Sequence, residues 1–345
     1  MGIALQTMTN ELTHVFLLSV GAFLLAMFLT PIYTFFAYRY RFWKRQRSES
    51  TDGKKLKVFA KFQAAKLRRN IPTMAGVIGV ISIFVVTIFF NLDRAQTWLP
   101  LAALVGGGIV GLIDDIINLR GLGGGAAGLR SPVKFALITL IGVVLGWFFF
   151  AKLGVASFHV PFVGEVNIGW LIAPLFAFAV VATGNAVNIS DGMDGLAGGL
   201  LGISFGAFGV IALLQQHVIL AGFCFTVVGV LLSYLWFNIY PARFFMGDVG
   251  SFAYGACLGV VAMLTDSLLL LPVIGLLFVI EAGSSLTQIV SKKLFKRKIF
   301  LSAPIHHHLE AIGWPETKVT MRFWVIGCVM AFIGVMLALA GGHIA

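Results

Sequence analysis

Long, almost uninterrupted apolar runs alternate with short polar segments along the whole chain. A helix needs about 20 apolar residues to cross the hydrocarbon core of a bilayer. Stretches such as Val77 to Phe90 lack the alternation of apolar and polar residues that a transmembrane barrel strand shows. The pattern therefore predicts an all-α integral membrane protein of about ten transmembrane helices, at approximately 14–38, 72–92, 98–113, 135–151, 168–187, 195–214, 218–238, 251–265, 267–290 and 323–342.

The composition supports this interpretation. Of the 345 residues, 59% are hydrophobic and 11% are charged, against roughly 25% charged residues in an ordinary soluble domain. This excludes a soluble globule, and we expect residues 1–345 to form a single polytopic membrane domain. A formal net charge of +11 would suggest a nucleic-acid partner for a soluble protein. Here the distribution of the basic residues matters more, and we expect no nucleic-acid partner.

The basic residues predict which segments face the cytoplasm. Of the 25 Lys and Arg residues, 23 fall in the segments 39–71, 114–134, 239–250 and 291–322. By the positive-inside rule these segments are cytoplasmic loops. Because successive spans alternate in direction, a short loop at 188–194 falls on the same side. Both termini are then expected on the outer side, periplasmic or extracellular.

An outer connection carries a weaker structural signal. The segment 153–167 holds short β-branched and aromatic stretches around Pro161 and Gly164. This composition is compatible with a small hairpin.

Five aspartates occur at the predicted cytoplasmic ends of the spans. They are the pair Asp114 and Asp115 in GLIDDIINL, Asp191 and Asp194 in NAVNISDGMDGLAGG, and Asp248 in FFMGDVGS. The topology rests on Lys and Arg alone, yet it brings all five to one membrane face. Helix capping accounts for any one of them but predicts no such convergence. We therefore expect an active site at the cytoplasmic face.

Clustered carboxylates imply a compensating cation. Carboxylates without an equal number of bases repel one another, and their pKa values rise unless a cation is bound. Hard oxygen ligands favour Mg²⁺ over Zn²⁺. Asp191 and Asp194 are three residues apart and would share one face if their stretch is helical. We expect all five aspartates to converge on one cation.

Three consecutive histidines form a second candidate constellation, in the loop 302–324. Successive side chains on a helix point about 100° apart, so at most two of His306, His307 and His308 share a target. No Cys or carboxylate completes a convincing zinc spacing here. Phosphate contact is the preferred role, with a purely structural role left open for at least one of the three. Glu281 lies inside a predicted span and either faces the bundle interior or contributes to the site.

Five ordered motifs carry a family resemblance. They are IPTMAG at 71–76, the aspartate pair in GLIDDIINL, NAVNISDGMDGLAGG at 185–199, WFNIYPARFFMGDVGS at 236–251 and PIHHHLEAIGWPETKVTMRFW at 304–324. The chain resembles the polyprenyl-phosphate N-acetylhexosamine-1-phosphate transferases. Its triple histidine with the Trp-Pro-Glu and Arg-Phe-Trp elements resembles the phospho-N-acetylmuramoyl-pentapeptide transferase branch.

The resemblance implies a reaction and its setting. It implies Mg²⁺-dependent transfer of phospho-MurNAc-pentapeptide from UDP-MurNAc-pentapeptide to undecaprenyl phosphate, which yields lipid I and UMP in the first membrane step of peptidoglycan synthesis. It further implies a multi-pass protein of the bacterial inner (cytoplasmic) membrane, in contact with the lipid bilayer and assembled as a homodimer.

The resemblance also assigns roles to residues. Asp114, Asp115 and Asp248 would be catalytic and would hold the metal. Two positions depart from the family pattern, because Arg68 and Asn118 stand where lysines are usual. The substrate-binding positions would be Arg68, Thr73, Lys134, Asn188, Asp191, Asp194, Phe245, His306, His307 and His308.

Two alternatives remain at this point. The first keeps the chemistry and changes the donor to UDP-GlcNAc or a related sugar nucleotide, although the 304–324 loop argues against it. The second, more remote, is an ion-coupled transporter. Transporters place their coupling acids near the bilayer midplane, where only Glu281 is a plausible candidate.

Overall fold

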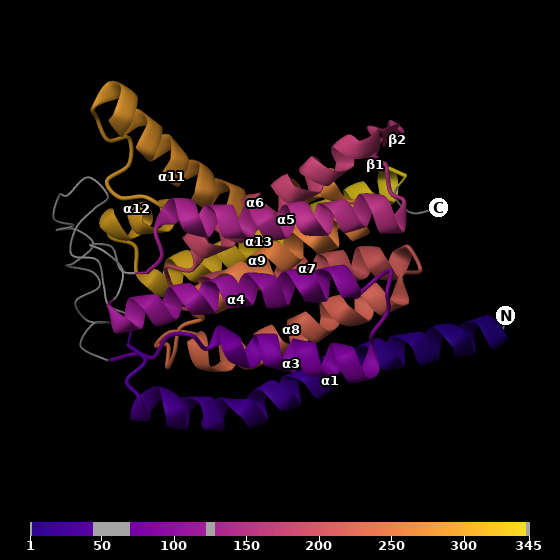
Figure 1. The fold of residues 1–345 in the computed structure, drawn as a ribbon, viewed down its shortest axis with the longest axis horizontal. Helices are drawn as coiled ribbons and strands as arrows, with labels where there is room; N and C mark the ends of the chain where they lie inside the picture. The colour runs from indigo at the N-terminus through magenta and orange to yellow at the C-terminus, as the bar shows by residue number, and fades with distance from the viewer. Residues whose placement is uncertain (1, 44–69, 122–127, 343–345) are drawn as a thin grey trace.

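The computed structural model describes residues 2–43, 70–121 and 128–342, which form a bundle of helices (Figure 1). The described helices are α1 (Gly2–Arg39), α3 (Gly76–Phe90), α4 (Trp98–Arg120), α5 (Ser131–Leu153), α6 (Ile172–Ser190), α7 (Leu196–Leu214), α8 (Val218–Asn238), α9 (Gly247–Leu264), α10 (Leu271–Ile274), α11 (Leu276–Phe295), α12 (Ile305–Ala311) and α13 (Glu316–Ala340). Two 3₁₀ turns, η1 (Gly169–Leu171) and η2 (Leu268–Leu270), and two strands, β1 (Ser157–Val160) and β2 (Gly164–Asn167), complete the described elements.

The helices confirm the all-α membrane fold. Among the described residues, eight helices are long and apolar enough to cross a membrane. Leu268–Ile274 and Leu276–Phe295 add a ninth if this pair, bent by 80°, is one span. Helix α3 is apolar but has only 15 residues, about 22 Å of helix against a hydrocarbon core of about 30 Å. Each of the ten predicted spans overlaps one of these segments, while the number ten itself stays a prediction.

One predicted loop begins later than the apolar pattern suggests. Helix α4 continues through Asp114 and Asp115 to Arg120, so the aspartate pair lies on a helix and not in a loop starting at residue 114. The helix ends where Gly121 adopts a left-handed conformation, with φ of 67°, which is a common way to terminate a helix. The chain therefore leaves the bundle two turns beyond the apolar run.

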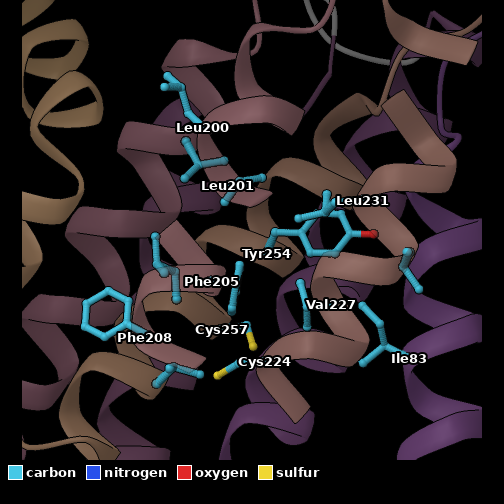
Figure 2. Close-up of a cluster of buried hydrophobic side chains, with 14 of the residues drawn as sticks. Ile83, Leu200, Leu201, Phe205, Phe208, Cys224, Val227, Leu231, Tyr254 and Cys257 are labelled. Carbon is cyan, nitrogen blue, oxygen red and sulfur yellow. The ribbon is translucent and has the colours of Figure 1, made fainter. Parts of the chain in front are cut away.

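Helix α9 lies in the centre of the bundle. Its residues from Gly247 to Met263 are all buried, and it packs chiefly against α4 and α6. Figure 2 shows part of the surrounding core, in which Tyr254 and Cys257 of α9 face side chains of α7 and α8. Cys224 and Cys257 are free and buried, as expected of packing residues.

Small residues let α4 approach α9 closely. A Cβ atom on Gly107 would lie 2.6 Å from the carbonyl oxygen of Phe252, and one on Gly111 would lie 2.1 Å from that of Asp248. Glycines four residues apart are a recurrent device for bringing two membrane helices into backbone contact. This approach places the end of α4 against the start of α9.

The two strands form the hairpin that the outer segment suggested. They are antiparallel, with His159 opposite Glu165. The hairpin lies at the end of the bundle where α1 begins and α13 ends, whereas α12 lies at the other end (Figure 1).

Candidate active site

Three of the five predicted aspartates form one buried cluster. Asp114 and Asp115 come from the last turns of α4, and Asp248 comes from the first turn of α9. One carboxylate oxygen from each lies within 4.8 Å of the others. All three residues are buried. The close approach of α4 to α9 thus brings two sequence motifs into one site.

Backbone groups fix two of these carboxylates. The Leu129 N–H donates to Asp114 Oδ1 over 2.6 Å, and the Val249 N–H donates to Asp115 Oδ2 over 3.1 Å. Val249 belongs to the first turn of α9, whose unpaired N–H groups and dipole favour negative charge. Gly247 has φ of 75°, and a Cβ atom there would lie 2.5 Å from Asp115 Oδ2. Glycine is therefore required where the backbone passes the carboxylate.

Lys134 lies between two of the carboxylates. It comes from the first turn of α5, and its Nζ is 2.6 Å from Asp248 Oδ2 and 2.9 Å from Asp114 Oδ2. Its ammonium group also lies 5.3 Å from the ring centre of Phe252, within the range of a cation–π contact. One lysine compensates only part of the charge of three carboxylates. A donor set made of carboxylate oxygens alone suits a hard divalent cation such as Mg²⁺.

Three predicted substrate-binding residues surround the start of α9. Asn188 of α6 donates from Nδ2 to Ser251 Oγ over 2.8 Å. The Phe245 N–H donates to the carbonyl oxygen of Pro72 over 2.8 Å, which joins the 70–76 segment to the approach to α9. A Cβ atom on Gly247 would lie 2.9 Å from Thr73 Oγ1. Arg68 lies outside the described residues.

Asp191 and Asp194 do not belong to this carboxylate group, so the expectation that all five aspartates converge on one cation is wrong for these two. Helix α6 ends at Ser190, so residues 191–195 form turns and not the helix that would put Asp191 and Asp194 on one face. Asp194 is buried, and its Oδ2 accepts a hydrogen bond from the Ala242 N–H at 3.0 Å. Its own N–H donates to Glu316 Oε1 over 2.7 Å. Asp194 thus fastens the 191–195 turn to two neighbouring segments.

Each of the three histidines has its own hydrogen-bond partner at Nδ1, although the rings of His306 and His307 are in contact. His306 Nδ1 is 2.7 Å from Glu281 Oε2, and both side chains are fully buried. His307 Nδ1 is 2.7 Å from Glu310 Oε2, and His308 Nδ1 accepts from the Leu301 N–H at 3.3 Å. The burial of His306 differs from the expected direct contact with phosphate. Burial lowers the pKa of His307 below its ordinary value, although Glu310 opposes the effect.

Sequence reasoning missed some of the residues that hold the site together. Ser251 and Glu316 lie inside quoted motifs, yet nothing in their spacing indicates the contacts that they make with Asn188 and the Asp194 backbone. The close packing of α4 could have been predicted from the sequence, because Gly107 and Gly111 are four residues apart in an apolar helix.

Comparison with known proteins places this arrangement in a class. Residues 97–266, which contain all three clustered aspartates, match the model of Glycosyl transferase family 4. This match and the apolar helices indicate a membrane-embedded glycosyl transferase.

Curated relatives narrow the class further. The chain is 38% identical to the phospho-N-acetylmuramoyl-pentapeptide-transferase of Chloroflexus aggregans, over 99% of this chain and 94% of that protein. The enzyme of the same name from Geobacillus thermodenitrificans is 35% identical, over 91% of this chain and 94% of that protein. The one from Oceanobacillus iheyensis is also 35% identical, over 94% of this chain and 98% of that protein. The chain belongs to the phospho-N-acetylmuramoyl-pentapeptide-transferase family.

Proposed function

We propose that this protein transfers phospho-MurNAc-pentapeptide from UDP-MurNAc-pentapeptide to undecaprenyl phosphate, releasing UMP and forming lipid I. Family membership supports the reaction. The observation that carries the proposal is the buried cluster of Asp114, Asp115 and Asp248 with Lys134 among them. Such a cluster serves a reaction between two highly charged phosphates, one on a soluble nucleotide and one on a lipid.

The three aspartates would hold Mg²⁺, which when bound screens the charge of the diphosphate and of the departing UMP. Lys134 would supply a second positive charge to the phosphates, and its ammonium group is already placed against Asp114 and Asp248. The second pKa of a phosphate monoester is about 6, so the lipid phosphate is mostly ionised at neutral pH. Positioning then contributes more than removal of a proton, which favours direct attack over a covalent aspartyl intermediate.

The remaining predicted residues would bind the nucleotide and sugar. Asn188 donates a hydrogen bond to Ser251, which lies one helical turn after Asp248 on α9. The half-buried Phe245 would stack on uracil. His307 and His308 are only partly buried and would contact the diphosphate or sugar. Asp191 would contribute from the 191–195 turn, Thr73 would join the phosphate-binding surroundings, and His306 and Asp194 would hold the loops in position.

The charge distribution and the family support the setting. By the positive-inside rule the aspartate cluster would face the cytoplasm and both termini would lie outside, and family membership supports the cytoplasmic membrane of a bacterium. Here the soluble donor arrives from the cytosol and the lipid acceptor from the inner leaflet. Assembly as a homodimer remains an expectation from the family resemblance.

Release of UMP by the purified protein tests the reaction. With UDP-MurNAc-pentapeptide, undecaprenyl phosphate and Mg²⁺, we expect UMP and a lipid-linked product in equal amounts. Release with UDP-GlcNAc and none with the muramoyl donor would assign the chain to the sibling reaction. Replacement of Mg²⁺ by EDTA should stop turnover.

Variants of the cluster test the residue roles. Asp248→Asn keeps the side-chain volume but removes a charge, and we expect turnover to be abolished while the nucleotide still binds. Asp93→Asn is a matched control, because Asp93 accepts local backbone hydrogen bonds in the connection between α3 and α4, away from the cluster. Unimpaired turnover in Asp248→Asn would remove Asp248 from the site.

A further inference from the structure

A second group of metal-ligating side chains lies at the other end of the bundle from the three aspartates. It consists of His159 on β1, Glu165 on β2 and Asp266 in the turn between α9 and η2. A histidine ring nitrogen and one oxygen from each carboxylate lie within 4.8 Å of one another. Asp248 lies in the first turn of α9 and Asp266 lies two residues beyond its end at Leu264, so about 24 Å of helix separates the two groups.

The tautomer of His159 suits a metal ligand. Its Nε2 lies 2.8 Å from the carbonyl oxygen of Gly341, and a carbonyl oxygen only accepts, so Nε2 carries the hydrogen. In the neutral ring the lone pair is then on Nδ1, which faces Glu165 Oε1 at 3.6 Å. Histidines that bind metals characteristically donate their other ring N–H to a carbonyl or carboxylate in this way.

The spacing of the His159 and Glu165 side chains also suits a small ion between them. A distance of 3.6 Å between Nδ1 and Oε1 exceeds the usual hydrogen-bond range. Two ligand atoms about 2.0–2.1 Å from one tetrahedral zinc ion are about 3.3 Å apart. A shift of a few tenths of an ångström would therefore bring Nδ1 of His159 and Oε1 of Glu165 to the spacing of two ligands on one ion.

The backbone holds the three side chains in place before any ion binds. His159 and Glu165 are directly opposite each other in the antiparallel pair, which brings side chains on one face together. Asp266 has φ of 50°, and its Oδ1 accepts a hydrogen bond from the His159 N–H at 2.9 Å. The Glu165 side chain is 58% exposed, so the site is open to solvent on one side.

We propose that His159, Glu165 and Asp266 form a structural zinc site, with solvent water as a fourth ligand. One imidazole nitrogen with two carboxylate oxygens is a donor set suited to Zn²⁺. The ion fastens the hairpin to the turn after α9, and through Gly341 it also secures the end of α13. This turn leads into η2 and the bent pair α10 and α11, so the site stabilises a segment that crosses to the catalytic end.

Zinc binding by the purified full-length protein tests the proposal. After treatment with EDTA, the protein is incubated with Zn²⁺ in a large excess of Mg²⁺, which occupies the aspartate cluster, and bound zinc is measured by elemental analysis. We expect wild-type protein to retain one more zinc ion per chain than Glu165→Gln, and its Tm to rise with Zn²⁺. In Glu165→Gln and His159→Gln we expect at least tenfold weaker zinc binding and loss of this rise.

Matched variants distinguish zinc bound at this site from zinc bound by other histidines. His217→Gln alters an exposed histidine at the same end of the bundle and should retain the wild-type ion. Equal zinc content in wild type and Glu165→Gln would overturn the proposal. A wild-type protein that holds no more zinc than His159→Gln would overturn it as well. If His159→Gln fails to fold, Glu165→Gln decides alone, because that side chain is more than half exposed.

Discussion

Glu281 of α11 and His306 of α12 form a fully buried pair, with 2.7 Å between Oε2 and Nδ1. The sequence left open whether Glu281 faces the bundle interior or contributes to the site, and the structure shows it inside the bundle, holding the first histidine of the triple. A Cβ atom on Gly192 would lie 2.4 Å from His306 Nε2. The imidazole therefore connects α11 to the 191–195 turn.

Replacing the carboxyl group of Glu281 by an amide should weaken the site while keeping the side-chain volume. In Glu281→Gln the pair loses the carboxyl group that bonds to His306 Nδ1, a hydrogen bond typically worth about 0.5–1.5 kcal/mol, and the turn near Asp191 loses its support. We expect a lower Tm and a lower kcat with a smaller change in KM, measured by thermal unfolding and by UMP release.

A second glutamate provides the control for this variant. Glu310 makes a hydrogen bond of the same length to His307 Nδ1, but both side chains are partly exposed. A pair that water can still reach usually contributes less than a fully buried one. Equal losses of Tm in Glu310→Gln and Glu281→Gln would contradict the role given to burial.

The contact between α4 and α9 predicts a steric effect. A Cβ atom on Gly111 would lie 2.1 Å from the carbonyl oxygen of Asp248, and neither backbone can move without separating the aspartates. Gly111→Ala should therefore destabilise the protein by about 1–3 kcal/mol or more and reduce turnover further. Gly206→Ala in α7 is the matched control, since nothing lies within 4 Å of its Cβ position. A functional Gly111→Ala with wild-type Tm would refute the close approach.

Lys134 should compete with a metal ion for the same carboxylates. Its Nζ is within 3 Å of Asp114 and Asp248, so replacing it with the uncharged Met removes a resident positive charge from the cluster. We expect Lys134→Met to bind Mn²⁺ several-fold more tightly in the absence of substrate, as measured by electron paramagnetic resonance, while turnover falls. Weaker Mn²⁺ binding would show that the lysine supports the metal site.

The apolar pattern predicted where the helices lie because membrane spans need long apolar runs, and each run matches a helical segment. It did not predict that α4 continues to Arg120, because two aspartates interrupt the apolar run while remaining compatible with a helix. The motifs correctly placed Asp114, Asp115 and Asp248 together.

The two remaining aspartates show where sequence spacing is insufficient. The face-sharing argument for Asp191 and Asp194 depends on a helix, and the chain forms turns there. The partners of Asp194 come from Ala242 and Glu316, which are far apart in sequence. Such contacts depend on how distant segments pack, and no local pattern encodes them.

The pH dependence of stability offers a test of the α12 region. Burial lowers the pKa of His307 below the ordinary 6.5, with His306 adding to the effect and Glu310 and Glu281 opposing it. Below pH 6.5 the unfolded chain therefore binds more protons at this position than the folded chain does. Its contribution to stability is complete above pH 6.5 and is lost as the pH falls toward the lowered value. Each pH unit by which the folded-state pKa lies below the unfolded-state pKa contributes about 1.4 kcal/mol to the free energy of unfolding.

His307→Gln should remove this acid sensitivity. We expect the Tm of wild type, relative to that of His307→Gln, to fall between pH 7.5 and pH 5.5 in the same detergent. Glu310→Gln should steepen the loss, because Glu310 is the neighbour that favours the protonated ring. A Tm difference between wild type and His307→Gln that is constant across this range would mean that the ring titrates in the folded protein as it does in the unfolded chain. The helix α12 would then be open to water around His307, and the imidazole would be a cation below pH 6.5.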